Sequence, residues 1–234
     1  MELSLPLRDR RDAGRRLAVL LDDLRGGCGC GRRDDLLVLG LPRGGLPVAY
    51  EIALALDAPL DVFVVRKLGV PGHEELAMGA IATGGVRVVN PDVVADARIR
   101  PEVLEAVVTT ERHELERRER LYRGARPPPE VRERTVILVD DGLATGSTMR
   151  AAVAAVSQLK ARAIVVAVPV AAPTVCHSFA AIVDRIVCGA TPQPFFAVGP
   201  WYLDFAQTTD DEVRALLAAA QRRQAADGRE QEND

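Results

Sequence analysis

Short, unbroken apolar runs alternate along this chain with segments in which apolar residues recur at helical spacing. Five runs have the length of buried strands, and they cover residues 36–41, 60–65, 136–139, 163–170 and 185–189. The segment between the first two runs follows one helix face, with apolar residues at Leu46, Ala49, Ile52, Ala53 and Leu56. Strand, helix, strand in this order predicts parallel strands joined by right-handed crossovers and buried on both faces. The pattern therefore predicts an α/β fold with a parallel sheet.

The remaining segments predict helices and turns around that sheet. Apolar residues on one face predict a helix over 8–24, followed by a glycine-rich, charged loop over 26–35. Two β-type runs flank Gly84-Gly85, which is a hairpin signal, and the stretch from 67 to 75 is polar and rich in turn residues. A capping box over 209–212 predicts a C-terminal helix, whose polar end we expect to fray from about Ala225.

A long charged helix is predicted from Pro101 to about Arg123. Between residues 111 and 120 only Leu115 is apolar. Three acid–base pairs stand four residues apart, namely Glu114 with Arg118, Glu116 with Arg120, and Glu119 with Arg123. Because acids and bases are nearly equal in number, we interpret this segment as a solvated face rather than a nucleic-acid surface. The three prolines at 127–129 end it as a stiff linker.

Composition excludes several classes of protein. The chain has 234 residues, which fits one large domain or two small ones, and 48% hydrophobic with 4% aromatic residues supports a sizeable aliphatic core. The formal net charge of −3 gives no general reason to expect a nucleic-acid partner. No apolar run approaches the roughly 20 residues needed to span a bilayer, and the first residues do not resemble a signal peptide. We therefore expect a cytoplasmic protein that binds neither nucleic acid nor membrane.

The four cysteines do not form a recognisable disulfide framework or zinc site. Cys28 and Cys30 lie in the glycine-rich loop, and Cys176 and Cys188 are far from them in the sequence. A single residue between two cysteines, without a nearby histidine, matches no zinc spacing. We therefore expect free thiols in a reducing compartment.

The segment from 136 to 148 carries the strongest chemical signal. Its apolar strand ends in Asp140 and Asp141, and a turn of small residues, 144–148, then opens a helix. Backbone N–H groups and hydroxyls at a helix N-terminus favour an anion such as a phosphate. Two adjacent acids can accept hydrogen bonds from sugar hydroxyls or hold a metal ion, whereas without a ligand their burial costs free energy. An accidental acid pair in an ordinary strand–turn–helix is the alternative interpretation.

This segment resembles the signature of the type I phosphoribosyltransferases, with four hydrophobic residues, two acids, three variable residues and Thr-Gly-Ser-Thr. The resemblance extends over most of residues 36–205 and is greatest to a subgroup of predicted phosphoribosyltransferases. Those proteins share Arg-Gly-Gly, Arg-Lys-Leu-Gly and a Val-Gly-x-Trp-Tyr-x-Asp-Phe tail. The resemblance implies one domain over 1–234, with a three-layer parallel-sheet core at about 36–190 and an inserted charged helix. A small hood would be built from terminal segments at about 1–30 and 191–225.

The resemblance also implies ligands and roles. The partners would be 5-phosphoribosyl-1-pyrophosphate and a small nitrogenous acceptor, with Mg²⁺ as cofactor; we also consider a homodimer. Asp140 and Asp141 would hold the ribose hydroxyls, and through them or water the metal. The 5-phosphate would bind a cradle formed by Ala144, Thr145, Gly146, Ser147 and Thr148. The pyrophosphate would bind Arg43, Gly44, Gly45, Arg66 and Lys67. We count the two acids, Arg66 and Lys67 as catalytic.

Two further features of the family can be matched to this sequence. The family's pyrophosphate loop commonly contains a cis peptide, which here corresponds to Pro42–Arg43 in the ligand-bound state. Its mobile lid corresponds to residues 68–78, in which His73 and Glu74 are either functional or simply solvated. An arginine in a tight strand–helix turn is the alternative interpretation of Arg43.

The aromatic run at 195–205 has two interpretations that the sequence leaves open. It is either a small satellite core or the base pocket of the hood. In the second interpretation Phe196 stacks on the base and Asp204 supports the metal-bound pyrophosphate. The acceptor also stays open, because Ala144 stands where hypoxanthine–guanine members carry an aspartate, which adenine and orotate members also lack. Nor does any Lys or Arg lie between Arg162 and Arg185, where hypoxanthine–guanine members carry a basic residue. A regulator that senses the ligand without turning it over is the alternative to an enzyme.

Overall fold

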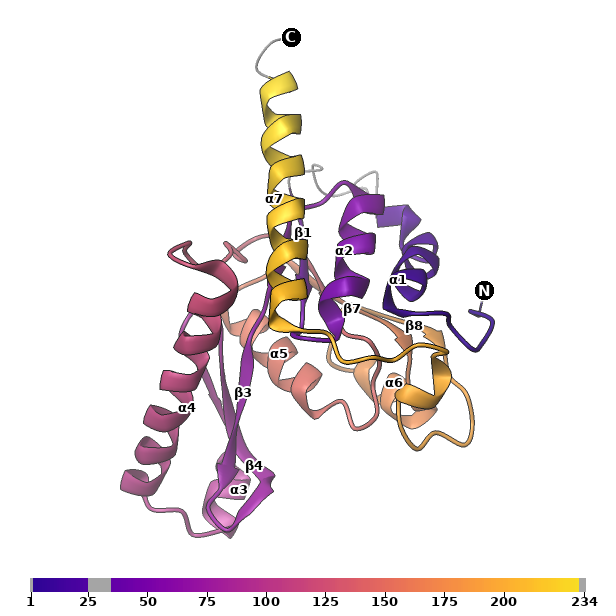
Figure 1. Cartoon of the computed structure of the whole chain (residues 1–234). Helices are drawn as coiled ribbons and strands as arrows, with labels where there is room; N and C mark the ends of the chain where they lie inside the picture. Colours follow the sequence, from indigo (N-terminus) through magenta and orange to yellow (C-terminus); the bar gives the residue numbers. More distant parts are fainter. Residues whose placement is uncertain (1, 25–34, 232–234) are drawn as a thin grey trace.

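The core of the protein is a five-stranded parallel sheet with the strand order β2-β1-β6-β7-β8 (Figure 1). The computed structural model describes residues 2–24 and 35–231, with side chains up to 226. The strands of this sheet are β1 Leu36–Gly40, β2 Leu60–Val62, β6 Thr135–Val139, β7 Ala163–Val170 and β8 Arg185–Ala190. The predicted α/β fold with a parallel sheet is therefore confirmed, and four of the five predicted strands agree to within about one residue.

Helices cover both faces of this sheet, as the apolar runs require. Successive residues of β1 and β6 alternate between two separate cores: Val38 and Ile137 belong to one, Leu39 and Leu138 to the other. The first core includes helices α1 Arg10–Val19, α2 Gly45–Leu56 and α7 Asp210–Gln231. The second includes α5 Ser147–Gln158 and α6 Pro173–Phe179. Because each strand is buried on both sides, it needs apolar residues at every position.

The chain leaves the main sheet after β2 and forms a separate antiparallel sheet in the order β3-β4-β5. Its strands are β3 Val65–Val70, β4 His73–Ala82 and β5 Val86–Val89. The prediction of a single strand over 60–65 was wrong, because Phe63 and Val64 are buried where the chain passes between the sheets. The predicted loop at 68–78 is instead a hairpin that turns at Gly72. The hairpin at Gly84-Gly85 is confirmed.

Helix α4, Pro101–Arg123, follows a short helix, α3 Pro91–Asp96, that the pattern did not predict. The three predicted ion pairs of α4 are present at 2.8, 3.9 and 2.9 Å. Within 111–120 only Leu115 is buried, and α4 is attached to the body of the protein through Leu104, Val108, Leu115 and Tyr122. The Arg123 side chain is only 2% exposed and pairs with Asp61 at 3.0 Å. The far end of α4 is thereby fixed to β2.

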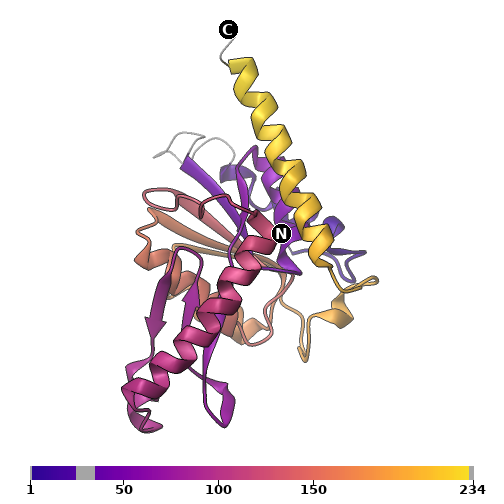
Figure 2. The same ribbon diagram turned by 60° about the vertical axis from the view of Figure 1, so that its left-hand side comes forward.

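The two terminal regions meet beside the edge of the main sheet. Leu7 bridges to Tyr202, and together with Ala13, Val170 and Ala190 they form a small third core. The predicted capping box opens α7, since Thr209 accepts a hydrogen bond from the Glu212 amide at 3.1 Å. The prediction that the helix frays from about Ala225 was wrong, because α7 continues to Gln231. It projects beyond the rest of the molecule (Figure 2).

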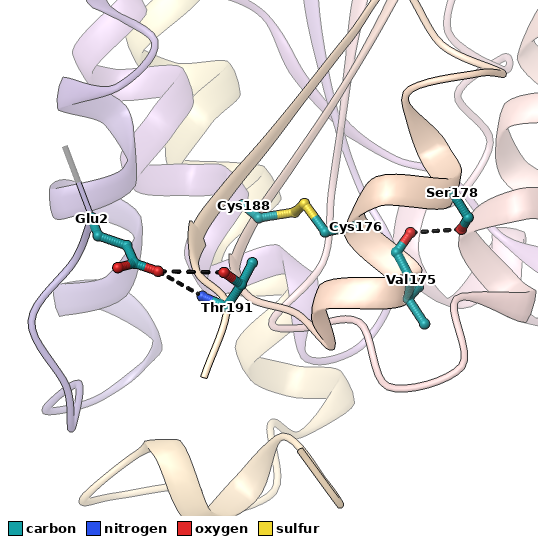
Figure 3. The surroundings of a disulfide bond; sticks show 6 residues. All are labelled: Glu2, Val175, Cys176, Ser178, Cys188 and Thr191. Carbon is teal, nitrogen blue, oxygen red and sulfur yellow. Dashed lines mark hydrogen bonds between the residues drawn. A yellow bond between two sulfur atoms is a disulfide. The ribbon is translucent and has the colours of Figure 1, made fainter. Parts of the chain in front are cut away.

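A disulfide joins Cys176 on α6 to Cys188 on β8 (Figure 3). The prediction of free thiols was therefore wrong for this pair, and Cys28 and Cys30 lie outside the described residues. The crossover that returns from α6 to β8 places the two Cα atoms 6.5 Å apart, a proximity that spacing along the chain does not reveal. The expectation of a reducing compartment depended on free thiols, so the disulfide removes the support for it. No helix among the described residues is long and apolar enough to cross a membrane.

Candidate functional site

The glycines that follow β1 lie directly against the two acids that follow β6. The strands pair in register, Gly40 opposite Val139, so both chains leave the sheet at the same edge. A methyl group at Gly45 would lie 2.6 Å from the Val139 carbonyl oxygen, and one at Gly44 would overlap a carboxylate oxygen of Asp141. The sheet therefore brings the predicted pyrophosphate loop and the predicted ribose-binding acids together, as expected for ligands at the carboxyl ends of parallel strands.

The replacement Gly45→Ala is expected to destabilise the protein by about 2 kcal/mol, although alanine favours a helix more than glycine does. The added methyl group would meet the backbone of Val139 and Asp140, at 2.6 and 2.9 Å, and neither can move without disturbing β6. Urea denaturation checks this prediction. Gly199→Ala is the control, because its nearest neighbour is a Phe205 ring atom at 3.2 Å. A Gly45→Ala protein as stable as the wild type would contradict the close packing described here.

The two acids have different surroundings. An oxygen of Asp140, Oδ1, accepts a hydrogen bond from the Asp141 amide at 2.9 Å. Burial, together with the neighbouring charge of Asp141, raises the pKa of the Asp140 carboxyl well above its ordinary value. Burial also raises the pKa of Asp141, but the charge of Arg10 and its hydrogen bond counteract part of that increase. Carboxyl groups whose pKa is perturbed in this way are common at functional sites.

Arg10, the first residue of α1, is a member of this site that the sequence did not identify. Its Nε donates to Asp141 Oδ2 at 2.8 Å, and its Nη1 donates to the Ala206 carbonyl at 2.7 Å. The guanidinium carbon lies 3.9 Å from the centre of the Phe205 ring. Arg10 therefore joins three segments that are distant in sequence, and as a polar residue at a helix start it gave no sequence signal of this role.

Tyr202 makes a second connection between the aromatic run and the acids. Its hydroxyl donates to the Asp141 carbonyl oxygen at 2.6 Å. Burial, with the negative charge of Asp141, raises the pKa of this phenol, so it keeps its proton and remains a donor. The run at 195–205 is thus attached to the predicted site. The satellite-core interpretation is confirmed for Phe195, Val198, Trp201 and Phe205, which pack against the third core. The base-pocket interpretation stays a prediction.

The turn at 144–148 opens helix α5, as the pattern predicted, and its role as a phosphate cradle stays a prediction. Gly146 caps α5 in the left-handed conformation, with φ of 70°. Ala144, Thr145, Ser147 and Thr148 are exposed around it. A methyl group at Gly146 would lie 2.8 Å from the Phe179 ring and 2.9 Å from Val175, so α6 packs directly under the turn. The N-terminus of α5 is therefore exposed at residues 144, 145, 147 and 148, and α6 packs against its buried side at Gly146.

Lys67 and Thr148 line the same groove, between the β3–β4 hairpin and α4. The groove encloses about 590 Å³, and its other lining residues include Arg66, Glu74, Glu75 and Glu111. Arg66 was expected at the carboxyl end of a parallel strand, which was wrong because it lies within β3. Its guanidinium pairs with Glu111 of α4 at 2.7 Å, whereas Lys67 pairs with Glu75 at 3.7 Å. Arg66 and Lys67 therefore both line the groove that Thr148 borders, and Arg66 is bound to α4 by its ion pair with Glu111.

Arg43 follows a cis peptide bond, Pro42–Arg43, as the resemblance implied. Its Nη1 lies 3.8 Å from Asp210 Oδ1, at the start of α7. The side chain therefore extends toward α4 and α7 while the backbone of the loop lies beside the acids.

The two residues predicted from the hood have few contacts. Phe196 is 88% exposed, and Asp204 is exposed and accepts a hydrogen bond from the Ala206 amide at 2.9 Å. Within residues 2–24 and 35–231, no three His, Cys, Asp or Glu side chains are grouped to hold a metal ion. Asp204 is therefore not gathered with Asp140 and Asp141 in this structure, and its predicted metal role stays a prediction, as does the stacking role of Phe196.

Comparisons with known proteins show the family of this chain. Residues 15–175 match the sequence profile of the phosphoribosyl transferase domain. Two Mycobacterium tuberculosis proteins, of strains CDC 1551 / Oshkosh and H37Rv and both named "Putative phosphoribosyl transferase", are 47% identical over 214 residues. That alignment covers 92% of this chain and 47% of each relative, so the chain spans about half the length of these curated relatives.

Solved structures show the same fold. The crystal structure of TT1426 from Thermus thermophilus is 42% identical, with a TM-score of 0.78, and the match covers 91% of this chain and 98% of that one. The structure of AQ2163 from Aquifex aeolicus is 14% identical with a TM-score of 0.50, covering 93% of this chain and 97% of that one. This second likeness concerns the fold alone.

Proposed function

The chain belongs to the phosphoribosyl transferase domain family, and from this premise we propose that it transfers a phosphoribosyl group from 5-phosphoribosyl-1-pyrophosphate to a nitrogenous acceptor. One observation carries the proposal. The carboxylates of residues 140 and 141 directly follow strand β6, and the exposed turn at 144–148 then begins helix α5, so both features belong to one strand–turn–helix. The helix N-terminus suits a phosphate, and the two carboxylates suit the two hydroxyl groups of a sugar. Together they match a phosphorylated ribose.

Each part of the site would bind one part of this substrate. Backbone N–H groups and hydroxyls at 144–148 would hold the 5-phosphate. The acids would accept hydrogen bonds from the ribose hydroxyls, and the loop at 42–45 with Lys67 would hold the pyrophosphate. In the transfer, the bond from C1 of the ribose to the pyrophosphate oxygen breaks, and that oxygen leaves with the electron pair. The acceptor nitrogen forms the new bond to C1 and then loses its proton.

The residues of the chain would act mainly by position and charge. Cations beside the leaving pyrophosphate stabilise the negative charge that it gains. The β3–β4 hairpin, whose tip at 71–76 is exposed, lies where it could cover the groove beside Thr148 and exclude water from the reacting carbon.

A magnesium ion fits the donor set of this site. Mg²⁺ prefers oxygen ligands and is commonly bound by one or two carboxylates together with substrate phosphates. Asp140 and Asp141 supply carboxylate oxygens, although Arg10 occupies Oδ2 of Asp141. We therefore propose that the ion arrives with the substrate and is held by these acids through ribose hydroxyls or water. When bound it would supply positive charge to the pyrophosphate.

The direct test is calorimetry with the magnesium complex of 5-phosphoribosyl-1-pyrophosphate, followed by a pyrophosphate-release assay across purines, pyrimidines and simple amines. Saturable binding and release with at least one acceptor would support the proposal. Binding without release for any acceptor would favour a sensor that does not turn the ligand over. Absence of binding would contradict both functions.

Lys67→Ala is expected to lower the rate of pyrophosphate release by about 100-fold, because a cation that faces the leaving group is lost. Lys160→Ala is the matched control. It removes the same charge from the residues that follow α5, away from the groove that Lys67 lines. Equal rates for the two variants would remove Lys67 from the catalytic site.

A further inference from the structure

A second cleft lies between α4 and the start of α7, and the loop at 42–45 forms part of its lining. Its volume is about 400 Å³, and it is lined by Pro42, Arg43, Arg117, Arg118, Leu121, Tyr122 and Asp210. Almost all of the exposed lining is polar. Helices α4 and α7 lie side by side at this level (Figures 1 and 2). The cleft thus differs from a typical small-molecule pocket, which is mostly apolar.

Positive charge exceeds negative charge around this cleft. Arg117 binds Glu114 through two hydrogen bonds, at 2.7 and 3.0 Å, and Arg118 binds the same carboxylate at 2.8 Å. One carboxylate therefore serves two guanidinium groups. These hydrogen bonds and charges lower the pKa of Glu114 to about 2, so it remains ionised and one positive charge stays in excess.

The third arginine adds to this excess. Arg43 Nη1 is 3.8 Å from Asp210 Oδ1, which is longer than a hydrogen bond, and that oxygen also accepts a hydrogen bond from Tyr122 at 2.7 Å. The contact with Asp210 therefore leaves the N–H groups of Arg43 available to a ligand. Including Glu114 and Asp210, three arginines face two acids at this cleft.

We propose that this cleft is a second anion site, which binds a diphosphate or longer polyphosphate group. Guanidinium groups bind phosphate oxygens through paired hydrogen bonds, and three of them around one polar cavity suit an extended anion with several phosphate oxygens better than a single carboxylate. The site is separate from the cradle at 144–148 and goes beyond the proposed transfer reaction. Two sources share this chemistry, namely free pyrophosphate and the polyphosphate chain of a nucleoside triphosphate.

Calorimetric titration of the whole protein with pyrophosphate, and separately with ATP, tests the site. For wild-type protein we expect two pyrophosphate sites, one at the backbone of the loop at 42–45 beside the acids, and one at the cleft, to which this loop contributes the Arg43 side chain. Arg117→Gln/Arg118→Gln should remove or weaken at least 10-fold one of the two, and should leave binding of 5-phosphoribosyl-1-pyrophosphate unchanged. Tighter binding of ATP than of pyrophosphate at the affected site would identify a nucleotide as the source, and the reverse would identify pyrophosphate.

The control is Arg112→Gln/Arg120→Gln, which removes the same charge from the same helix at two residues that do not line the cleft. Pyrophosphate binding that is the same in all three proteins would overturn the proposal. So would a loss of 5-phosphoribosyl-1-pyrophosphate binding in Arg117→Gln/Arg118→Gln, which would make the cleft part of the first site. If the proposed transfer function is wrong but the cleft is real, wild-type protein shows one pyrophosphate site and the cleft variant shows none.

Discussion

Asp140→Asn is expected to stabilise the unliganded protein and to weaken its binding of 5-phosphoribosyl-1-pyrophosphate. Burial and the charge of Asp141 raise the pKa of Asp140, so the folded protein holds this proton to a higher pH than the unfolded chain does. This contribution makes the protein less stable as the pH rises from the ordinary range of aspartate, about 4, toward the raised value. Asparagine has no charge to bury, and its side-chain oxygen can still accept the Asp141 amide.

We expect the free energy of unfolding at pH 7 to rise by about 1 kcal/mol, a size typical of single substitutions, because the buried charge is removed. Affinity for the ligand should fall by about 100-fold, because charged hydrogen bonds to the ribose are lost. Urea denaturation at pH 5 and pH 7, together with calorimetry, measures both. The stabilisation should be smaller at pH 5, where the wild-type carboxyl carries less charge. If the variant is less stable than the wild type at pH 7, then Asp140 stabilises the fold. That result would contradict the assignment of Asp140 to ligand binding at a cost in stability.

Arg10→Gln is expected to cost about 3 kcal/mol of stability, because it leaves the carboxylate of Asp141 buried without its partner. The side chains of Arg10 and Asp141 are 12% and 16% exposed, so water can replace the lost contact only in part. The variant also loses the cation–π contact with Phe205 and weakens the link to Ala206. Ligand affinity should fall as well, since Asp141 would no longer be held in place.

The double variant Arg10→Gln/Asp141→Asn separates charge pairing from packing. Because neither charge remains buried, we expect the double variant to regain about 2 kcal/mol of the free energy of unfolding that Arg10→Gln loses. A double-mutant cycle measures this difference as the interaction energy of the pair. Arg11→Gln is the control: it is the next residue of α1, its side chain is 47% exposed, and its partner Glu51 also contacts Arg15. A double variant no more stable than Arg10→Gln alone would show that the ion pair is not the source of the loss.

The parts of the fold that the sequence predicted are those written in consecutive residues. Burial on both faces requires the unbroken apolar runs of β1, β6 and β7, and it also requires α2 and α5 to have one apolar face each. The cradle at 144–148 and the acids at 140 and 141 belong to a single strand–turn–helix, so their relative positions follow from local geometry. The loop after β1 could be placed beside them because parallel strands end at the same edge.

Several features of the site depended on contacts that local pattern does not report. The apolar run at 60–65 passes from one sheet to another, and only tertiary packing decides where the first strand stops. The hairpin at 68–78 was misread as a loop, because polar residues such as His73, Glu74 and Glu75 occupy its exposed tip, while Leu68, Val70 and Met78 face the core. The Cys176–Cys188 pair required the return of α6 onto β8.

By itself, the sequence determined the parallel α/β core, the helix N-terminus that can receive a phosphate, and the two acids beside it. These depend on the periodicity of burial and on hydrogen bonds between near neighbours. The tertiary structure decided that Arg10 pairs with Asp141, 131 residues away, that Arg66 turns to Glu111, and that Arg43 shares a cleft with Arg117 and Arg118. A charged residue at a helix or strand surface is compatible with many partners, and only the packing of distant elements selects the one that it meets.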